Sequence, residues 1–65
     1  MLSAFREVRL ITARYTSEGV QSGMTGYIIE VHGDGNYEVE FSDPATGVSF
    51  AQIVAREDEL VLVDR

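Results

Sequence analysis

Hydrophobic and polar residues alternate with a period of two along much of this chain. Residues 37–41 show the pattern most clearly, because Tyr37, Val39 and Phe41 alternate with Glu38 and Glu40. This period places the apolar side chains on one face of a β-strand and the carboxylates on the other. Windows of ten residues do not show the three- and four-residue apolar spacing of a helix. The sequence therefore predicts an all-β fold.

Four further segments have the composition of strands. Val8 and Leu10 alternate with charged residues in the first of them. In the second, the apolar positions change phase at Ile28 and Ile29, which indicates a bulge or a strand buried on both faces. The expected strands are residues 7–11, 24–31, 36–41, 48–54 and 60–63.

The segments between these strands have the composition of turns. Residues 33–36 and 43–47 are rich in Gly, Asp, Asn and Pro, which suit hairpin turns. Residues 13–23 form a longer polar loop, and residues 55–58 suit one 3-10 turn before the last strand. The order is that of a five-stranded meander, and closing a meander removes the exposed edges of a small sheet.

We therefore expect residues 1–65 to form one domain, a small five-stranded SH3-like barrel. Gly23 and Gly26 precede a strand rather than a helix, so they are unlike a phosphate-binding loop. They suit a turn and a tightly curved strand in which a side chain would collide. The expected core comprises Val8, Leu10, Met24, Ile28, Val31, Tyr37, Val39, Phe41, Phe50, Ile53, Leu60 and Leu62.

The size and composition of the chain argue against an enzyme. A domain of about 60 residues buries only about 60% of the surface of its unfolded chain, which leaves little room for an enclosed active site. The 65 residues include no cysteine and one histidine, so disulfides and thiolate metal sites are excluded. The carboxylates lack the spacing of a calcium loop. We expect no catalytic residues, no cofactor and no metal.

The charge of the chain favours a basic protein as its partner. Eleven acidic and five basic residues give a net charge of -6, and all five basic residues are arginine. Nucleic-acid binding requires a positive field, which argues against DNA or RNA as a partner. A negative field attracts a basic protein instead. We see no signal-peptide or membrane-spanning run, and expect a cytoplasmic monomer or weak homodimer without membrane contact.

Four runs of the sequence, at residues 7–10, 23–28, 37–41 and 58–60, resemble a family of short bacterial proteins that is catalogued as a domain of unknown function. The most specific part is residues 23–41, where a Gly-x-x-Gly strand start is followed by an Asp-Gly turn and a Tyr-x-Val-x-Phe strand. The resemblance implies an SH3-like barrel without established catalytic residues. Members of that family are often encoded beside toxin-like genes, which implies an antitoxin or immunity role.

Glu30, Glu38 and Glu40, with Asp34 and Asp43 nearby, form the candidate partner-binding surface. Glu38 and Glu40 share one strand face, and pairing of the second and third strands brings Glu30 close to Glu38. Like charges that face each other across strands are destabilising, so we interpret this surface as one kept for a basic partner. The alternative interpretation is a solvated outer face that discourages aggregation between sheet edges.

Two residues outside this surface are further candidates for function. Tyr15, in the long loop, is the aromatic residue best suited to contact a partner, together with Glu18. The alternative is a loop tyrosine that packs on the end of the barrel. His32 precedes a hairpin turn, where a lone histidine usually neither senses pH nor binds a metal.

Three functions fit the sequence. The first is a non-enzymatic protein-binding module, such as an antitoxin or immunity-like inhibitor, that uses an acidic surface against a basic protein partner. The second is a nucleic-acid or ribosome-associated barrel, which needs a basic patch or exposed stacking aromatics. The third is a structural or regulatory subunit of a larger complex, which an exposed apolar patch would favour.

Overall fold

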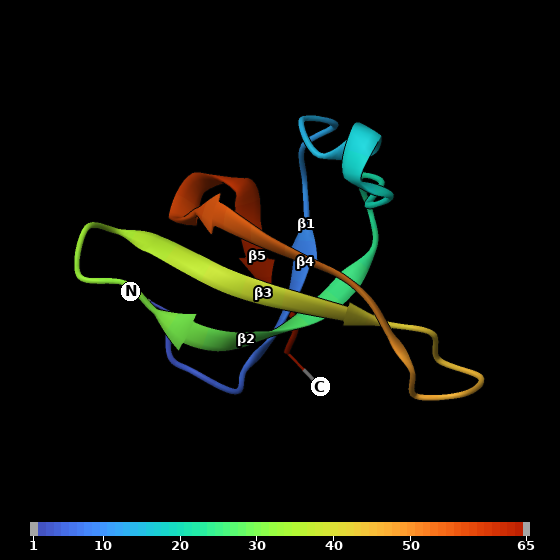
Figure 1. The fold of residues 1–65 in the computed structure, drawn as a ribbon. Coiled ribbons are helices and arrows are strands. Elements are labelled where there is room, and N and C mark those ends of the chain that lie inside the picture. The colour runs from blue at the N-terminus through green and yellow to red at the C-terminus, as the bar shows by residue number, and fades with distance from the viewer. Residues whose placement is uncertain (1, 65) are drawn as a thin grey trace.

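The computed structural model describes residues 2–64 and consists of one five-stranded antiparallel sheet (Figure 1). The strands lie in the order β4-β3-β2-β1-β5, and each strand is antiparallel to its neighbours. The predicted all-β fold is confirmed. The strand bounds are β1 Glu7–Leu10, β2 Thr25–Val31, β3 Asn36–Ser42, β4 Ser49–Arg56 and β5 Leu60–Leu62.

Two 3-10 turns complete the fold. The turn η2, at Glu57–Glu59, precedes the last strand as predicted. It begins two residues later than expected, because Ala55 and Arg56 extend β4 and pair with β3. The second turn, η1 at Thr16–Glu18, lies within the long loop between β1 and β2 and was not predicted. Within residues 2–64, no helix has the length and apolar character needed to cross a membrane.

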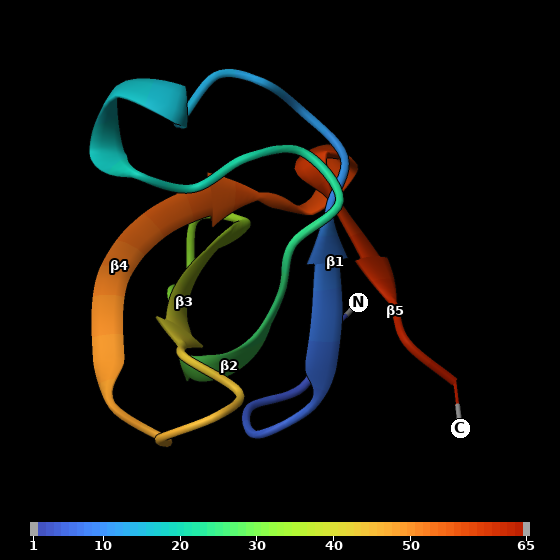
Figure 2. The same ribbon diagram turned by 90° about the vertical axis from the view of Figure 1, so that its right-hand side faces the viewer.

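The sheet is strongly curved (Figure 2). It is nevertheless open, since β4 and β5 form its two edges and no ladder joins them within residues 2–64. The turn η2 connects these two edge strands along the chain. A closed barrel is therefore not confirmed.

Gly26 permits the close packing inside this curve. The residue is buried in β2, and a Cβ atom there would lie 2.6 Å from the carbonyl oxygen of Glu40 and 2.9 Å from the Phe41 ring. The predicted collision at this glycine is confirmed, and Gly23 adopts the positive φ of a turn. The predicted irregularity in β2 is also confirmed, because the β2–β3 register shifts between Ile28 and Glu30.

The core lies on the concave face of the sheet and follows the predicted alternation. Met24 and Val31 are only partly buried, although they pack against the core. Of the predicted core residues, those that are buried are Val8, Leu10, Ile28, Tyr37, Val39, Phe41, Ile53 and Leu60.

The predicted core was wrong at two positions and incomplete at three. Phe50 and Leu62 are exposed rather than buried. Phe50 lies where the β3–β4 register shifts, between Ala51, which pairs with Phe41, and Ser49, which pairs with Ser42. In β4, Phe50 has the phase of the exposed residues Gln52 and Val54 rather than that of the buried residues Ile53 and Ala55. Leu62 lies at the end of an edge strand. The buried residues that were missed are Tyr15, Val20 and Ala55.

Candidate functional site

The acidic residues of β2 and β3 lie together on the outer face of the sheet. Glu30 pairs directly with Glu38 across the two strands, and Glu40 pairs with Tyr27. Their neighbours on β4 are Val54, opposite Glu38, and Gln52, opposite Glu40. We call the surface formed by Tyr27, Glu30, Glu38, Glu40 and Val54 the acidic face. The structure thus brings together three of the predicted site residues.

The three carboxylates of the acidic face differ in their partners. Glu38 accepts a hydrogen bond from Gln52 Nε2 and lies 3.2 Å from His32 Nε2. Within residues 2–64, neither Glu30 nor Glu40 forms an ion pair or a side-chain hydrogen bond. The face therefore holds two carboxylates whose charge no neighbouring side chain neutralises.

Asp34 lies beside the acidic face, in the β2–β3 turn, and has a local role. Its Oδ1 accepts a hydrogen bond from the backbone N–H of Asn36 at 3.2 Å, which closes an Asx-type turn. Asp34 therefore orders the hairpin turn, and it does not belong to the strand rows that carry the three glutamates.

Tyr15 is buried, with only 6% of its surface exposed. Its hydroxyl lies 2.7 Å from Glu59 Oε1 and 3.0 Å from the carbonyl oxygen of Val54, and the Arg14 guanidinium donates to it. Burial and the hydrogen bond with Glu59 raise the pKa of the phenol. The structure thus supports the alternative interpretation of a packed loop tyrosine, because this side chain offers no surface to a partner.

Glu59 forms the centre of a polar network that sequence reasoning missed. Only 4% of the residue is exposed, and its carboxylate accepts hydrogen bonds from Arg14 at 2.6 and 2.9 Å and from the Arg56 backbone N–H at 2.9 Å. The hydrogen bonds from Arg14 lower the pKa of Glu59 to about 2. We call Arg14, Tyr15, Arg56 and Glu59 the Glu59 network. It fastens the long loop to η2, and within residues 2–64 none of its buried side-chain nitrogen or oxygen atoms lacks a hydrogen-bond partner.

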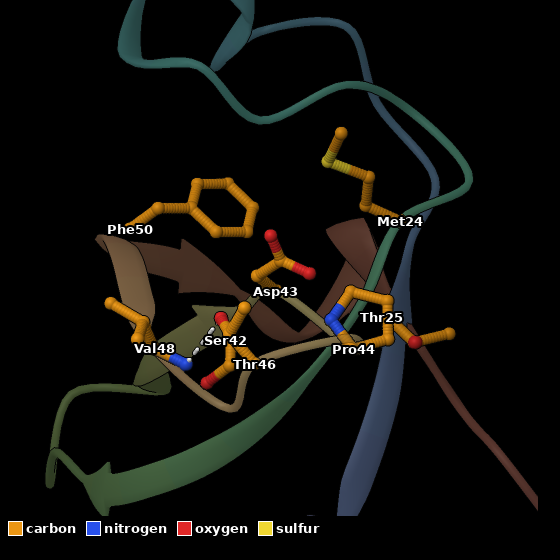
Figure 3. Close-up of a pocket in the computed structure, with 8 residues that line it drawn as sticks. All are labelled: Met24, Thr25, Ser42, Asp43, Pro44, Thr46, Val48 and Phe50. Carbon is orange, nitrogen blue, oxygen red and sulfur yellow. Dashed lines mark hydrogen bonds between the residues drawn. The ribbon is translucent and has the colours of Figure 1, made fainter.

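A groove with largely apolar walls lies where the β3–β4 hairpin meets the start of β2 (Figure 3). Its volume is about 680 Å³, which is within the range of about 300–1,000 Å³ typical of small-ligand sites. Val48 and Phe50 are 63% and 50% exposed, so the groove opens to solvent. Its apolar walls are Met24, Pro44, Val48 and Phe50, and we call it the hairpin groove.

Asp43 supplies the one charged group that lines the hairpin groove among the described residues. Figure 3 shows its carboxylate between the Phe50 ring and Met24. Oδ1 accepts a hydrogen bond from the Ala45 backbone N–H at 2.8 Å. Within residues 2–64, Oδ2 accepts none. The carboxylate therefore has capacity for a further donor.

A second hollow of about 340 Å³ adjoins the hairpin groove and shares Asp43 and Pro44 with it. This hollow is also lined by Tyr27, which belongs to the acidic face. The hairpin groove and the acidic face are therefore parts of one continuous surface.

Sequence reasoning did not find the hairpin groove. The alternating pattern assigned Phe50 and Met24 to the core, and residues 43–47 were interpreted only as a turn. The exposed pair Val48 and Phe50, directly after a Pro-containing turn, was the available signal. Among residues 2–64, no group of three or more His, Asp or Glu side chains is arranged to hold a metal ion.

Comparison with curated proteins and with solved structures gave no significant match. Comparison with protein-family models matched residues 7–62 to the domain of unknown function DUF4926. The match spans all five strands. This chain therefore belongs to the DUF4926 family.

Proposed function

We propose that this protein is a non-enzymatic protein-binding module whose acidic face contacts a basic protein partner. The observation that carries the proposal is the direct pairing of Glu30 with Glu38 on neighbouring strands. Like charges in this arrangement destabilise a sheet by a few tenths of a kcal/mol or more. A basic partner offsets this repulsion, so the arrangement is more favourable in a complex than in the free protein.

The composition of the acidic face suits a protein partner. Tyr27 and Val54 are exposed large hydrophobic residues, and each pairs with a glutamate of the face. Protein interfaces combine an apolar centre rich in aromatic residues with a polar rim. Nucleic-acid binding is less well supported, because the net charge is -6 and two of the five arginines, Arg14 and Arg56, are engaged with carboxylates.

Two further parts of the proposal are the SH3-like fold and the inhibitor role. The first rests on the order of the strands, and the second rests on the resemblance to a family of short bacterial proteins. We class the curved sheet with the SH3-like barrels, because β1–β4 form a meander, a 3-10 turn precedes the last strand, and β5 pairs with β1. The resemblance to short bacterial proteins encoded beside toxin-like genes supports an antitoxin or immunity-like role in the cytoplasm. In that role the protein inhibits its basic partner by covering a surface that the partner needs.

A second candidate function is that of a subunit in a larger complex. Eight large hydrophobic side chains are exposed among the described residues, and two of them, Val61 and Leu62, lie in the edge strand β5. A subunit interface is more apolar than a transient one, so this function predicts a complex that persists at high salt. The exposed residues are Phe5, Ile11, Tyr27, Val48, Phe50, Val54, Val61 and Leu62.

A capture experiment with matched variants tests the proposed function. The tagged protein is incubated at low salt with lysate of its native host, beside Glu30→Lys/Glu40→Lys and the control Glu18→Lys/Asp64→Lys. Glu30 and Glu40 have no side-chain partners to lose within residues 2–64, and a lysine at position 30 faces Glu38, which favours the fold. Both variants change the net charge by the same amount.

We expect the native form and the control to capture the same basic protein, and the acidic-face variant to lose it. A partner that all three forms capture equally contradicts the acidic-face proposal. If that shared complex also survives high salt, the subunit function is the better account.

A further inference from the structure

The hairpin groove combines apolar walls with a single carboxylate, and this combination suits one kind of side chain. We propose that the groove binds an arginine side chain of the basic partner, with Asp43 accepting hydrogen bonds from the guanidinium and Phe50 stacking on its plane. This inference rests on the proposed function and assigns to the partner an anchor that the acidic face does not define.

The apolar walls of the groove include two exposed side chains. Phe50 and Val48 are two of the most exposed large hydrophobic residues, and they lie three residues or fewer from the end of the hairpin turn. Exposed apolar side chains that line a hollow are typical of a binding site.

The carboxylate of Asp43 is held in place before any ligand binds. The backbone N–H of Asp43 donates to the Val48 carbonyl oxygen at 2.9 Å, and the backbone carbonyl oxygen of Asp43 accepts from the Gly47 N–H at 2.7 Å. The Ala45 N–H fixes Oδ1 at 2.8 Å, which leaves Oδ2 for the ligand. A preorganised acceptor of this kind avoids the loss of side-chain entropy on binding.

Charge and shape favour arginine as the occupant. No basic residue lines either hollow within residues 2–64, and the chain carries a net charge of -6. The guanidinium is planar and weakly hydrated, stacks on aromatic rings and forms directional hydrogen bonds with carboxylates. Its aliphatic stem packs on apolar walls such as Met24 and Pro44. Lysine lacks the planar group that would use Phe50.

Thr25, Ser42 and Thr46 also line the groove and supply hydroxyl oxygens. A guanidinium has five N–H donors, more than one carboxylate satisfies. Thr46 Oγ1 already accepts a hydrogen bond from the Val48 N–H at 3.2 Å, so solvent water accepts from the guanidinium donors that Asp43 leaves over.

A titration followed by two-dimensional ¹⁵N–¹H NMR tests the proposal. The probe is the tripeptide acetyl-Gly-Arg-Gly-amide at low ionic strength. Its controls are the same peptide with citrulline, which is the neutral isostere, and with lysine. The arginine peptide is expected to shift the amide signals of the groove in a saturable way. The lysine peptide is expected to bind more weakly, and the citrulline peptide at least about tenfold more weakly.

Three variants of the protein sharpen this test. Asp43→Asn keeps an oxygen that accepts from the Ala45 N–H but removes the charge, and it is expected to weaken binding about tenfold. Phe50→Leu removes the ring and is expected to weaken binding about two- to fivefold. The matched control is Asp34→Asn, because Asp34 has the same turn-closing role outside the groove, and this variant is expected to bind like the native protein.

Several outcomes overturn the proposal. Absence of saturable shifts at the groove does so, as does equal binding of the arginine and citrulline peptides. If the lysine peptide binds as tightly as the arginine peptide, the assignment to arginine is contradicted. If Asp34→Asn weakens binding of the arginine peptide as much as Asp43→Asn does, the peptide responds only to the overall charge. The proposed function fails separately: it fails when the partner is captured despite Glu30→Lys/Glu40→Lys, whatever the peptides do.

Discussion

Glu59 and Asp43 are both carboxylates, but their surroundings differ in every respect that matters for function. Glu59 is buried and accepts hydrogen bonds from Arg14, Tyr15 and the Arg56 backbone. Asp43 is exposed in a groove with apolar walls, and one of its oxygens accepts no hydrogen bond from residues 2–64. The Glu59 network is complete within the protein, whereas the hairpin groove lacks a donor that a partner would supply.

This difference indicates which residues stabilise the small domain and which residues remain available to bind a partner. A buried carboxylate with all its partners fastens the long loop to the end of the sheet. An exposed carboxylate between apolar walls contributes little to folding and remains available to a ligand. Substitutions in the Glu59 network should therefore change stability, and substitutions in the hairpin groove should change binding while leaving stability nearly unaltered.

The largest effect is expected for Glu59→Ala. The substitution removes the acceptor of Arg14, Tyr15 and the Arg56 N–H, and it should lower the free energy of unfolding by about 2–4 kcal/mol. Chemical denaturation followed by circular dichroism measures this change. An unfolding free energy within about 0.5 kcal/mol of the native value would show that the network does not stabilise the fold.

Acid should weaken the native protein more than Glu59→Gln. The folded-state pKa of Glu59 is lowered from 4.5 to about 2, mainly by the hydrogen bonds from Arg14. A lowered pKa gives stability that is fully present above the unfolded-state pKa and is lost as pH falls through the folded-state pKa. The loss should amount to about 2–3 kcal/mol between pH 4.5 and pH 2.

Denaturation curves over this pH window measure the difference between the two proteins. Because the side-chain amide that replaces the carboxylate in Glu59→Gln does not titrate, the variant should lose less stability than the native protein. Parallel losses in the two proteins would contradict the lowered pKa of Glu59.

The Tyr15→Phe substitution measures what the hydroxyl of this residue contributes to stability, separately from the ring. The ring stays buried, but the hydrogen bond to Glu59 is lost, so a cost of about 1 kcal/mol is expected. Thermal unfolding measures the change, and Tyr27→Phe on the exposed face is the control. If Tyr15→Phe also abolishes partner capture while the fold remains intact, the comparison between a stabilising region and a binding region fails.

The smallest effect on stability is expected in the hairpin groove. Phe50→Leu and Asp43→Asn should each change the unfolding free energy by less than about 0.5 kcal/mol, because leucine retains apolar contact at a half-exposed position and asparagine retains the turn-closing oxygen. The measurement is the same denaturation curve. A loss above about 1 kcal/mol in either variant would show that the groove supports the fold.

The strands and turns were readable from the sequence because they depend on local patterns. Alternation in residues 37–41 locates β3, and the phase change at Ile28 locates the irregularity in β2. The collision that Gly26 avoids was also foreseeable, since a tightly curved strand brings backbones close together. These features need no knowledge of contacts between distant residues.

The Glu59 network and the hairpin groove depend on contacts that no local pattern encodes. Arg14 and Glu59 are 45 residues apart in the chain, and they meet only because the long loop folds back over η2. The groove is lined by the β3–β4 hairpin and by Met24 and Thr25, which only the folded chain brings together. The sequence alone also did not reveal the register shift beside Phe50, because a β-bulge is defined by the pairing with the neighbouring strand.

The most direct test of the central claim is the affinity of the purified partner for the native protein and for Glu30→Lys/Glu40→Lys over a range of salt concentrations. The account predicts tight binding of the native protein that weakens as salt rises, and binding at least about tenfold weaker for the variant at low salt. Equal affinities for the two proteins, unchanged by salt, would contradict the claim that the acidic face binds a basic partner.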